Sequence, residues 1–383
     1  MIKGVEMPEK ETPIERALKK IAEFQVKKAE KLVLIAITAS IILGIGMIHL
    51  TFNTNITKEM PQNMKSIKLQ NEINNDFRGG KVLFIIVSLK KGCYATNMPT
   101  DIRDWRVMES MLSLQKELEK ETNVEKVVSP ATIFENMGYV PKNNEIIKKI
   151  ISNSEMSDFF SRDYSSALMI VDANTGSSEK DVERLTSDIK NDISHVEKPP
   201  CVEYQLTGDA PIRVVLLNLL IGDMKRTFVI AAIIIFFLLV LLRRSIIQAV
   251  LIMTPLLMGM AWTMGTLGWL NVHLSIAVAG IGAMLLGLGV EYGVFVLERY
   301  LEEREKGKSI EEAIITSVPS VCSSIFGSGT TTIVSFLALA TVAFPMIRNL
   351  GLTLGFGIFC MLFSAVFIEP CLIIVKDKHG GVK

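Results

Sequence analysis

The stretch that decides the fold class is Gly280-Ile-Gly-Ala-Met-Leu-Leu-Gly-Leu-Gly-Val-Glu-Tyr-Gly-Val-Phe-Val-Leu-Glu-Arg-Tyr300. Together with the apolar residues before it, it is long enough to cross a bilayer, because about 20 apolar residues span the hydrocarbon core as a helix. Lipid offers no partner for an unpaired backbone group, so a single apolar segment that crosses it must be helical. The stretch therefore predicts a transmembrane helix, and it places the carboxyl of Glu291 well inside the membrane.

Five further stretches of the chain have the same character. Of 383 residues, 49% are hydrophobic and 21% are charged, and the mean hydropathy is +0.37, which is too apolar for a water-soluble domain. The apolar excess is concentrated in residues 226–375, whereas residues 53–225 resemble a polar globular sequence. We therefore predict an α-helical membrane protein with six transmembrane helices and one α+β domain. The predicted spans are about Leu32–Leu50, Thr227–Leu242, Ile246–Leu267, Leu274–Leu297, Pro319–Val342 and Leu350–Val375.

Positive charges beside the spans predict the orientation. Lysines precede the first span, Arg243 and Arg244 separate the second from the third, and Arg299 and Arg304 follow the fourth. Segments rich in Lys and Arg stay in the cytoplasm. We expect a multi-pass protein of the cell membrane with both termini in the cytoplasm. The expected parts are a cytoplasmic amphipathic leader (1–31), the first transmembrane helix (32–52), the extracytoplasmic domain (53–225), a five-helix transmembrane bundle (226–375) and a cytoplasmic tail (376–383).

The leader has the signals of a helix start. Thr12-Pro13-Ile14-Glu15 offers an N-cap, a proline at the first helical position and a capping-box glutamate. We expect an amphipathic helix on the inner membrane surface, and a plain anchoring role is the simpler interpretation. Its expected apolar face consists of Ile14, Leu18, Ile21 and Phe24.

The extracytoplasmic domain alternates β-prone and helical segments. Strand, helix and strand are expected at 81–89, 101–121 and 124–128, and again at 167–171, 178–193 and 202–206, which makes two βαβ units. The helical period of 209–224 predicts a helix that continues into the second span. Cys93 and Cys201 could pair in an oxidising space, but their spacing favours ordinary buried thiols.

Several functional classes have no support in the sequence. No phosphate loop, nucleophile elbow or Cys and His cluster of metal-ligand spacing occurs, so we expect no enzyme, no cofactor and no metal. The formal net charge is +1 and the basic residues flank the spans, so we expect no nucleic-acid partner.

Glu291 is the candidate functional residue. An ionisable group near the centre of a bilayer costs roughly 3 kcal/mol, so it is usually retained for ion or proton movement. Loss of water favours the neutral carboxyl, which can then load and release a proton. Tyr292 and the hydroxyls of the fifth span are candidate relay groups, although each hydroxyl alone is explained by bonding to its own helix. The predicted proton relay is Glu291, Tyr292, Ser328, Thr330 and Thr331.

The arrangement resembles one half of a resistance-nodulation-division (RND) transporter, and most closely the mycobacterial membrane protein large (MMPL) branch. The resemblance rests on Gly289-Val-Glu-Tyr-Gly-Val-Phe-Val-Leu-Glu-Arg-Tyr-Leu-Glu-Glu303, Thr330-Thr331-Thr332, Asn349-Leu-Gly-Leu-Thr-Leu-Gly355 and Glu369-Pro370, which is similar to a Leu-Pro pair that ends the sixth span. It implies a proton-driven transporter of lipids or other hydrophobic compounds, with protons as the coupling ion. Glu291 stands where the family usually has an aspartate that carries the proton.

The same resemblance implies a homo-oligomer, with a dimer favoured, because typical members fuse two such halves. Two other functions stay open. One is a Sec-associated translocation factor of the D or F type, whose cargo is a polypeptide. The other is a lipid-sensing or sterol-sensing scaffold that does not pump.

Overall fold

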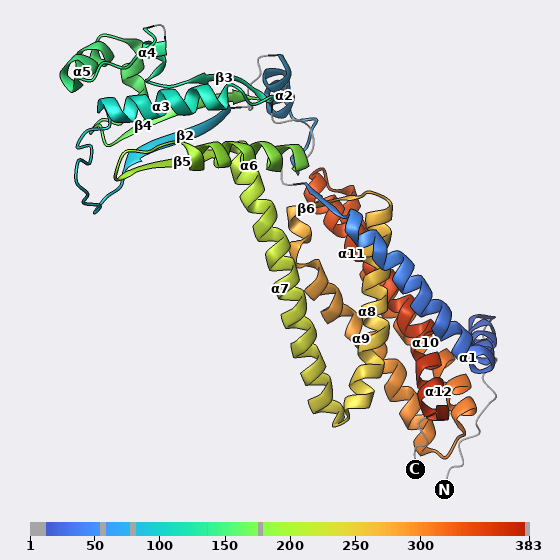
Figure 1. Cartoon of the computed structure of the whole chain (residues 1–383). Helices are drawn as coiled ribbons and strands as arrows, with labels where there is room; N and C mark the ends of the chain where they lie inside the picture. The colour runs from blue at the N-terminus through green and yellow to red at the C-terminus, as the bar shows by residue number, and fades with distance from the viewer. Residues whose placement is uncertain (1–12, 54–58, 77–81, 136, 175–178, 380–383) are drawn as a thin grey trace. The chain divides into compact units, whose positions relative to one another are not determined.

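The computed structural model describes residues 13–53, 59–76, 82–135, 137–174 and 179–379 (Figure 1). These residues form two compact units. The membrane unit contains residues up to 61 and from 220 onward, and the α+β unit contains residues 62–219. Helix α7 (Asp209–Arg243) is continuous, as its period predicted, so its first residues belong to the α+β unit and the rest to the membrane unit.

The membrane unit confirms the predicted class, because six of its described helices are long and apolar enough to cross a membrane. Besides α7 they are α1 (Pro13–Ile45), α8 (Ile246–Trp269), α9 (Ile281–Glu305), α10 (Ile310–Ala338) and the pair α11 (Pro345–Phe367) and α12 (Glu369–His379). Short 3-10 segments η1 (Gly46–His49), η4 (Ile276–Gly280) and η5 (Leu339–Thr341) adjoin these helices, and strands β1 (Thr51–Asn53) and β6 (His273–Ser275) pair in parallel.

Two spans begin or continue differently from the prediction. The fourth was expected from Leu274, but α9 begins only at Ile281, after β6 and η4. The sixth was expected as one helix, but it is broken at Ile368 between α11 and α12. Pro370 explains the break, because a proline inside a helix has no N–H to donate and its ring crowds the carbonyl four residues earlier.

The leader forms the first part of α1, but its buried face differs from the expected one. Leu18, Ala22, Gln25 and Ala29 are buried, whereas Phe24 is 48% exposed. The pattern missed this face because alanine and glutamine contribute little to hydropathy. The leader packs against the bundle through this face. Thr12 and the side chain of Ile14 lie outside the described part of the chain.

Glycines bring α1 and α8 into direct backbone contact. A Cβ atom built on Gly265 would overlap the Leu43 carbonyl, and one built on Gly268 would overlap the Gly46 carbonyl. Small residues allow such close approach of helices in membranes, where packing replaces the hydrophobic effect as the driving force. This contact holds the first span against the third.

The α+β unit has a four-stranded antiparallel sheet in the order β3-β4-β2-β5. Its strands are β2 (Val82–Leu89), β3 (Val124–Val128), β4 (Ser166–Ala173) and β5 (Val202–Gly208). Each predicted βαβ unit is present, with α3 (Trp105–Leu118) and α6 (Glu179–His195) as the crossovers, but the two units are interleaved: β4 lies between β2 and β3. The smaller helices are α2 (Lys65–Asp76), α4 (Thr132–Glu135), α5 (Asn144–Ser152) and η3 (Glu155–Phe159).

One face of the sheet carries the core of this unit. Alternate residues of β2 and β4 are buried, among them Leu83, Ile85 and Met169, and they pack with Met111 of α3 and Leu185 of α6. The sequence shows both strands as short apolar β-prone runs, which is the signal that predicted them. The expected start of β2 at Lys81 falls outside the described residues.

Cys93 and Cys201 form a disulfide with a Cα–Cα distance of 5.7 Å, so the preference for free thiols was wrong. The pairing follows from the sheet: β2 and β5 are neighbours, with Leu89 opposite Val202, and the Lys90 amide donates to the Cys201 carbonyl. This brings the end of β2 next to the start of β5, although the two cysteines are 108 residues apart.

Replacing both cysteines, Cys93→Ser with Cys201→Ser, is expected to lower the free energy of unfolding of the α+β unit by about 2–4 kcal/mol, because the bridge closes a long loop of the unfolded chain. Urea unfolding of the whole purified protein, followed by protease sensitivity of the α+β unit, measures the loss. Replacing buried Cys322 of α10 by Ser is the control, because it removes a thiol and no bridge. Equal stability of the double variant and the wild type would contradict a bridged native state.

Candidate functional site

A polar groove of about 630 Å³ runs between α9 and α10. We call it the α9–α10 groove. Charged residues and hydroxyls make it unlike the neighbouring apolar surface. Its lining consists of Glu291, Tyr292, Phe295, Glu298, Arg299 and Glu302 of α9 and Ser320, Val321, Ser324, Ile325 and Ser328 of α10.

The α10 side of the groove has serines at a spacing of four residues. Ser320, Ser324 and Ser328 are all exposed and follow one another along one helix face. The helix itself begins with a capping box, in which Ser309 and Glu312 satisfy each other's backbone amides. The start of α10 is therefore fixed, which fixes the direction in which the serine stripe points.

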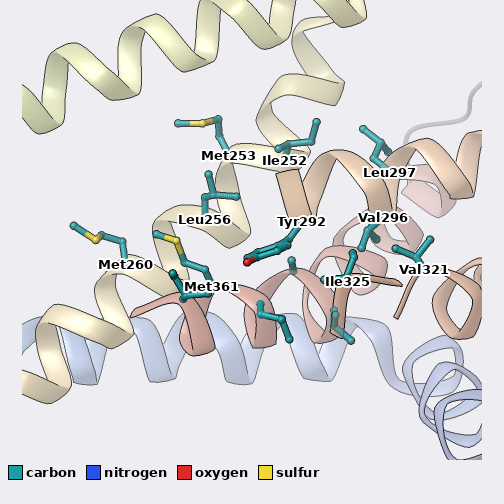
Figure 2. Close-up of a cluster of buried hydrophobic side chains, with 14 of the residues drawn as sticks. Ile252, Met253, Leu256, Met260, Tyr292, Val296, Leu297, Val321, Ile325 and Met361 are labelled. Atoms are coloured by element: carbon teal, nitrogen blue, oxygen red, sulfur yellow. The ribbon is translucent and has the colours of Figure 1, made fainter. Parts of the chain in front are cut away.

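The α9 side places consecutive residues in different directions, because neighbours on a helix are rotated by about 100°. Glu291 is exposed on the outer surface of the bundle, so a single chain does not enclose its carboxyl. Tyr292 is 1% exposed, and its ring lies in the apolar cluster with Leu256 and Met361 (Figure 2). Its hydroxyl makes no hydrogen bond among the described residues.

The predicted relay is only partly brought together. Glu291, Tyr292 and Ser328 line the α9–α10 groove, but Thr330 and Thr331 do not. Both threonines are exposed, and the Thr331 hydroxyl donates to the Ser328 carbonyl at 2.7 Å, which satisfies it within its own helix. The hydroxyl that faces the groove beside Glu291 is supplied by the serine stripe instead.

The cytoplasm-facing side predicted for the bundle carries ion pairs at the end of α9. Arg243 contacts Glu298 at 3.3 Å, and Arg299 contacts Glu302 at 2.7 Å. Glu291 has no such partner among the described residues, because Arg299, the one cation in the lining of the groove, is paired with Glu302 and Glu303. Glu291 is thus distinguished from the other acids of the groove by its isolation.

A second carboxyl of the membrane unit was missed by sequence reasoning. Glu369, the first residue of α12, is 0% exposed, and neither of its oxygens has a hydrogen-bond partner among the described residues. In the sequence it stood only as one half of the Glu-Pro pair that ends the sixth span. The sequence did contain a signal for this residue: an acid inside an apolar run, directly before a proline. A proline breaks the helix there, and the acid at the break can be buried inside the bundle.

Residues 60–380 of this chain match the MMPL family. The chain belongs to the MMPL family. This confirms the resemblance drawn from the fourth-span motif and the span arrangement. Putative membrane protein MJ1562 of Methanocaldococcus jannaschii is 31% identical over 368 residues, which are 94% of each chain.

Other relatives of this MMPL protein match it over shorter segments. Siderophore exporter MmpL5 of Mycobacterium tuberculosis is 25% identical over 50% of this chain, and the match spans 20% of the exporter. Protein translocase subunit SecD of Koribacter versatilis is 32% identical over 30% of this chain and 21% of its own length. The chain therefore covers only about a fifth of each of these two relatives.

Proposed function

We propose that this MMPL protein transports lipids or other hydrophobic compounds across the membrane, driven by proton movement through Glu291. The observation that carries the proposal is an unpaired carboxyl in the middle of a spanning helix, beside a stripe of hydroxyls. An isolated acid at this depth costs roughly 3 kcal/mol and is otherwise selected against. The named substrates of MMPL relatives, a siderophore and a sulfolipid, support a hydrophobic or amphipathic cargo.

We also propose that the α+β unit lies outside the cell and both termini lie inside. The distribution of Lys and Arg supports this orientation. The Cys93–Cys201 bridge supports it as well, because disulfides persist mainly in oxidising compartments.

The test is transport by the purified protein in liposomes with an imposed pH gradient. The probe is a fluorescent phospholipid whose fluorescence is quenched from one side only. Gradient-dependent movement of the probe, abolished by a proton ionophore and absent from empty liposomes, is the expected result. Movement that is equal with and without the gradient would contradict proton coupling.

We also propose that a second copy of the chain packs over the α9–α10 groove. Exposed Glu291, Ser324 and Ser328 would otherwise face hydrocarbon, where unpaired polar groups are costly. A two-fold contact would bring two such grooves together and hide both.

Membrane-permeant thiol cross-linking tests this contact. Ser324→Cys is expected to give a cross-linked dimer in native membranes, because Ser324 lies on the outer face of α10 within the groove. Thr38→Cys is the control, since Thr38 lies exposed on α1, away from the groove. The three buried native thiols set the background in the wild type. Equal yields for the two variants, or none for either, would rule out the proposed interface.

The similarity to SecD keeps a second function in view, in which the cargo is a polypeptide. The two functions differ in a measurable way. A polypeptide factor would speed the release of a secreted precursor from membrane vesicles and leave the phospholipid probe unmoved.

A further inference from the structure

The break between α11 and α12 exposes backbone groups that the rest of the bundle must satisfy. Pro370 cannot donate to the Val366 carbonyl, which would be its partner in an unbroken helix. Gln25 of α1 supplies the missing donor: its Nε2 donates to the Val366 carbonyl at 3.0 Å and to the Phe367 carbonyl at 3.2 Å. Gln25 is itself 1% exposed. The break is thus stabilised by a side chain of another span, which bonds to the carbonyls that the break leaves without a donor.

Glu369 follows this break directly and points its carboxyl at α9. A Cβ atom built on Gly293 would lie 3.0 Å from Oε2 and 3.5 Å from Oε1 of Glu369, and 3.0 Å from Cγ2 of Ile252 on α8. Glycine at position 293 therefore makes room for the carboxyl. Gly293 is two residues from Glu291, so the same turn of α9 presents one acid to the groove and receives another from α12.

The surroundings of Glu369 offer no charge to balance an ionised carboxylate. Of the elements packed against α12, α8 contributes no charged residue, and α9 contributes the buried phenols of Tyr292 and Tyr300. The charged residues of α9 are engaged elsewhere: Glu303 contacts Lys306 and Lys308, and the α9–α10 groove is lined by Glu291, Glu298, Arg299 and Glu302. The charged groups of the other elements contact the far end of α12 or water. Tyr300 donates to Asp377 at 2.6 Å, Glu311 of α10 is 3.5 Å from Lys378, Glu30 of α1 is 3.8 Å from His379, and Lys20 and Lys27 of α1 are exposed.

An ionised carboxylate that is fully buried, without a hydrogen-bond donor or a counter-charge, costs far more than a neutral acid. A neutral acid avoids this cost, because it carries no charge. Burial thus favours the protonated form in the conformation described here.

We propose that Glu369 is a second proton-binding carboxyl of the transport cycle. It holds a proton while it is enclosed against Gly293, and it releases that proton to water when the contact between α12 and α9 opens. The step makes and breaks one O–H bond, and the proton gradient supplies and removes the proton. The proposal rests on the proposed function, in which Glu291 binds a proton from the α9–α10 groove, and it places a second binding site on the opposite side of the same helix turn.

Infrared difference spectroscopy tests the protonated state without reference to transport. The wild type is expected to show the carbonyl stretch of a neutral carboxylic acid in an apolar environment. Exchange into heavy water should lower the frequency of this band, which identifies it as a protonated carboxyl. Glu291→Gln should retain this band and Glu369→Gln should lose it. A wild-type spectrum without this band at neutral pH, or a Glu369→Gln spectrum identical to that of the wild type, would overturn the proposal.

Liposome flux tests the role in the cycle. Glutamine has nearly the size of the neutral acid, so Glu369→Gln should fold and assemble normally yet lose gradient-driven movement of the phospholipid probe by at least tenfold. A purely structural Glu369 would instead give wild-type flux in this variant, and that result would overturn the proposal while Glu291→Gln still abolished flux. If the wild type shows no gradient-driven flux at all, the proposed function fails, and the transport role of Glu369 fails with it.

Gly293→Ala gives an independent test, because it changes the residue that the Glu369 carboxyl contacts and leaves Glu369 itself in place. The added methyl group would press on Oε2 of Glu369 and on Ile252, so the infrared band should shift and the flux should fall. Gly222→Ala on α7 is the matched control, because a Cβ atom there meets no atom within 4 Å. An unchanged band in Gly293→Ala would contradict the contact on which the proposal stands.

Discussion

Glu291→Gln is expected to abolish proton-driven transport while leaving the protein folded. Glutamine keeps the size and polarity of the side chain and removes only its ability to bind and release a proton. One charge moving through 100 mV yields about 2.3 kcal/mol, which biases a two-state equilibrium about fiftyfold. A variant that has lost coupling should therefore no longer hold the probe at a concentration ratio of about fiftyfold across the membrane. The measurement is flux of the phospholipid probe in liposomes with an imposed gradient.

Two further variants make this result specific. Glu291→Asp keeps a carboxyl on a shorter arm and should retain part of the flux. Glu298→Gln is the matched control, because Glu298 lines the same groove but already contacts Arg243 at 3.3 Å near the end of the span. Surface pairs of this kind contribute about 1 kcal/mol or less. Undiminished coupled flux in Glu291→Gln, or equal losses in both glutamine variants, would contradict the assigned role.

Gly265→Val is expected to prevent assembly of the membrane unit. The side chain would overlap the Leu43 carbonyl, and neither backbone can move without separating α1 from α8. Overpacking typically costs about 1–3 kcal/mol even where side chains can adjust, and a clash with backbone leaves less room for relief. We expect little monodisperse protein in size-exclusion chromatography and a lower melting temperature in detergent.

The control for this substitution is the glycine that follows Leu43 on α1. Gly44→Val on α1 makes the same chemical change where a Cβ atom meets no atom within 4 Å, so it tests the effect of valine itself on a helix. It should purify like the wild type. If Gly265→Val and Gly44→Val behaved alike, the close approach of α1 and α8 would not be the cause.

The strands and spans could be predicted because each depends on local patterns. β2 and β4 are short apolar β-prone runs, and the spans are apolar over a bilayer's thickness. The Cys93–Cys201 bridge could not be predicted, because it depends on which strands become neighbours. The sheet order also depends on contacts between residues far apart in the chain, so two correctly predicted βαβ units did not reveal that they are interleaved.

A residue of the candidate site could be predicted only where its own type and its place in an apolar span were enough to mark it. An acid in an apolar span identified Glu291 as the candidate. The direction of its side chain was not predictable, since facing the bundle or its outer surface depends on how α9 packs. Glu369 was overlooked because its burial depends on Gly293, which makes room for the carboxyl, and on Gln25, which bonds to the helix break. Neither residue stands out in the sequence. Hydroxyl content likewise suggested Thr330 and Thr331, whereas helix rotation places the serine stripe in the groove.

The bond from Gln25 to the Val366 carbonyl joins residues 341 positions apart, and this has a consequence for biosynthesis. A ribosome makes Gln25 341 residues before Val366, so the polar side chain of Gln25 can reach its acceptors only after the sixth span has been made and inserted. Contacts of such large sequence separation form slowly, because most of the chain must be ordered first. During that interval the buried face of the leader has no acceptor on the sixth span, so the leader cannot complete its docking until the break between α11 and α12 has formed.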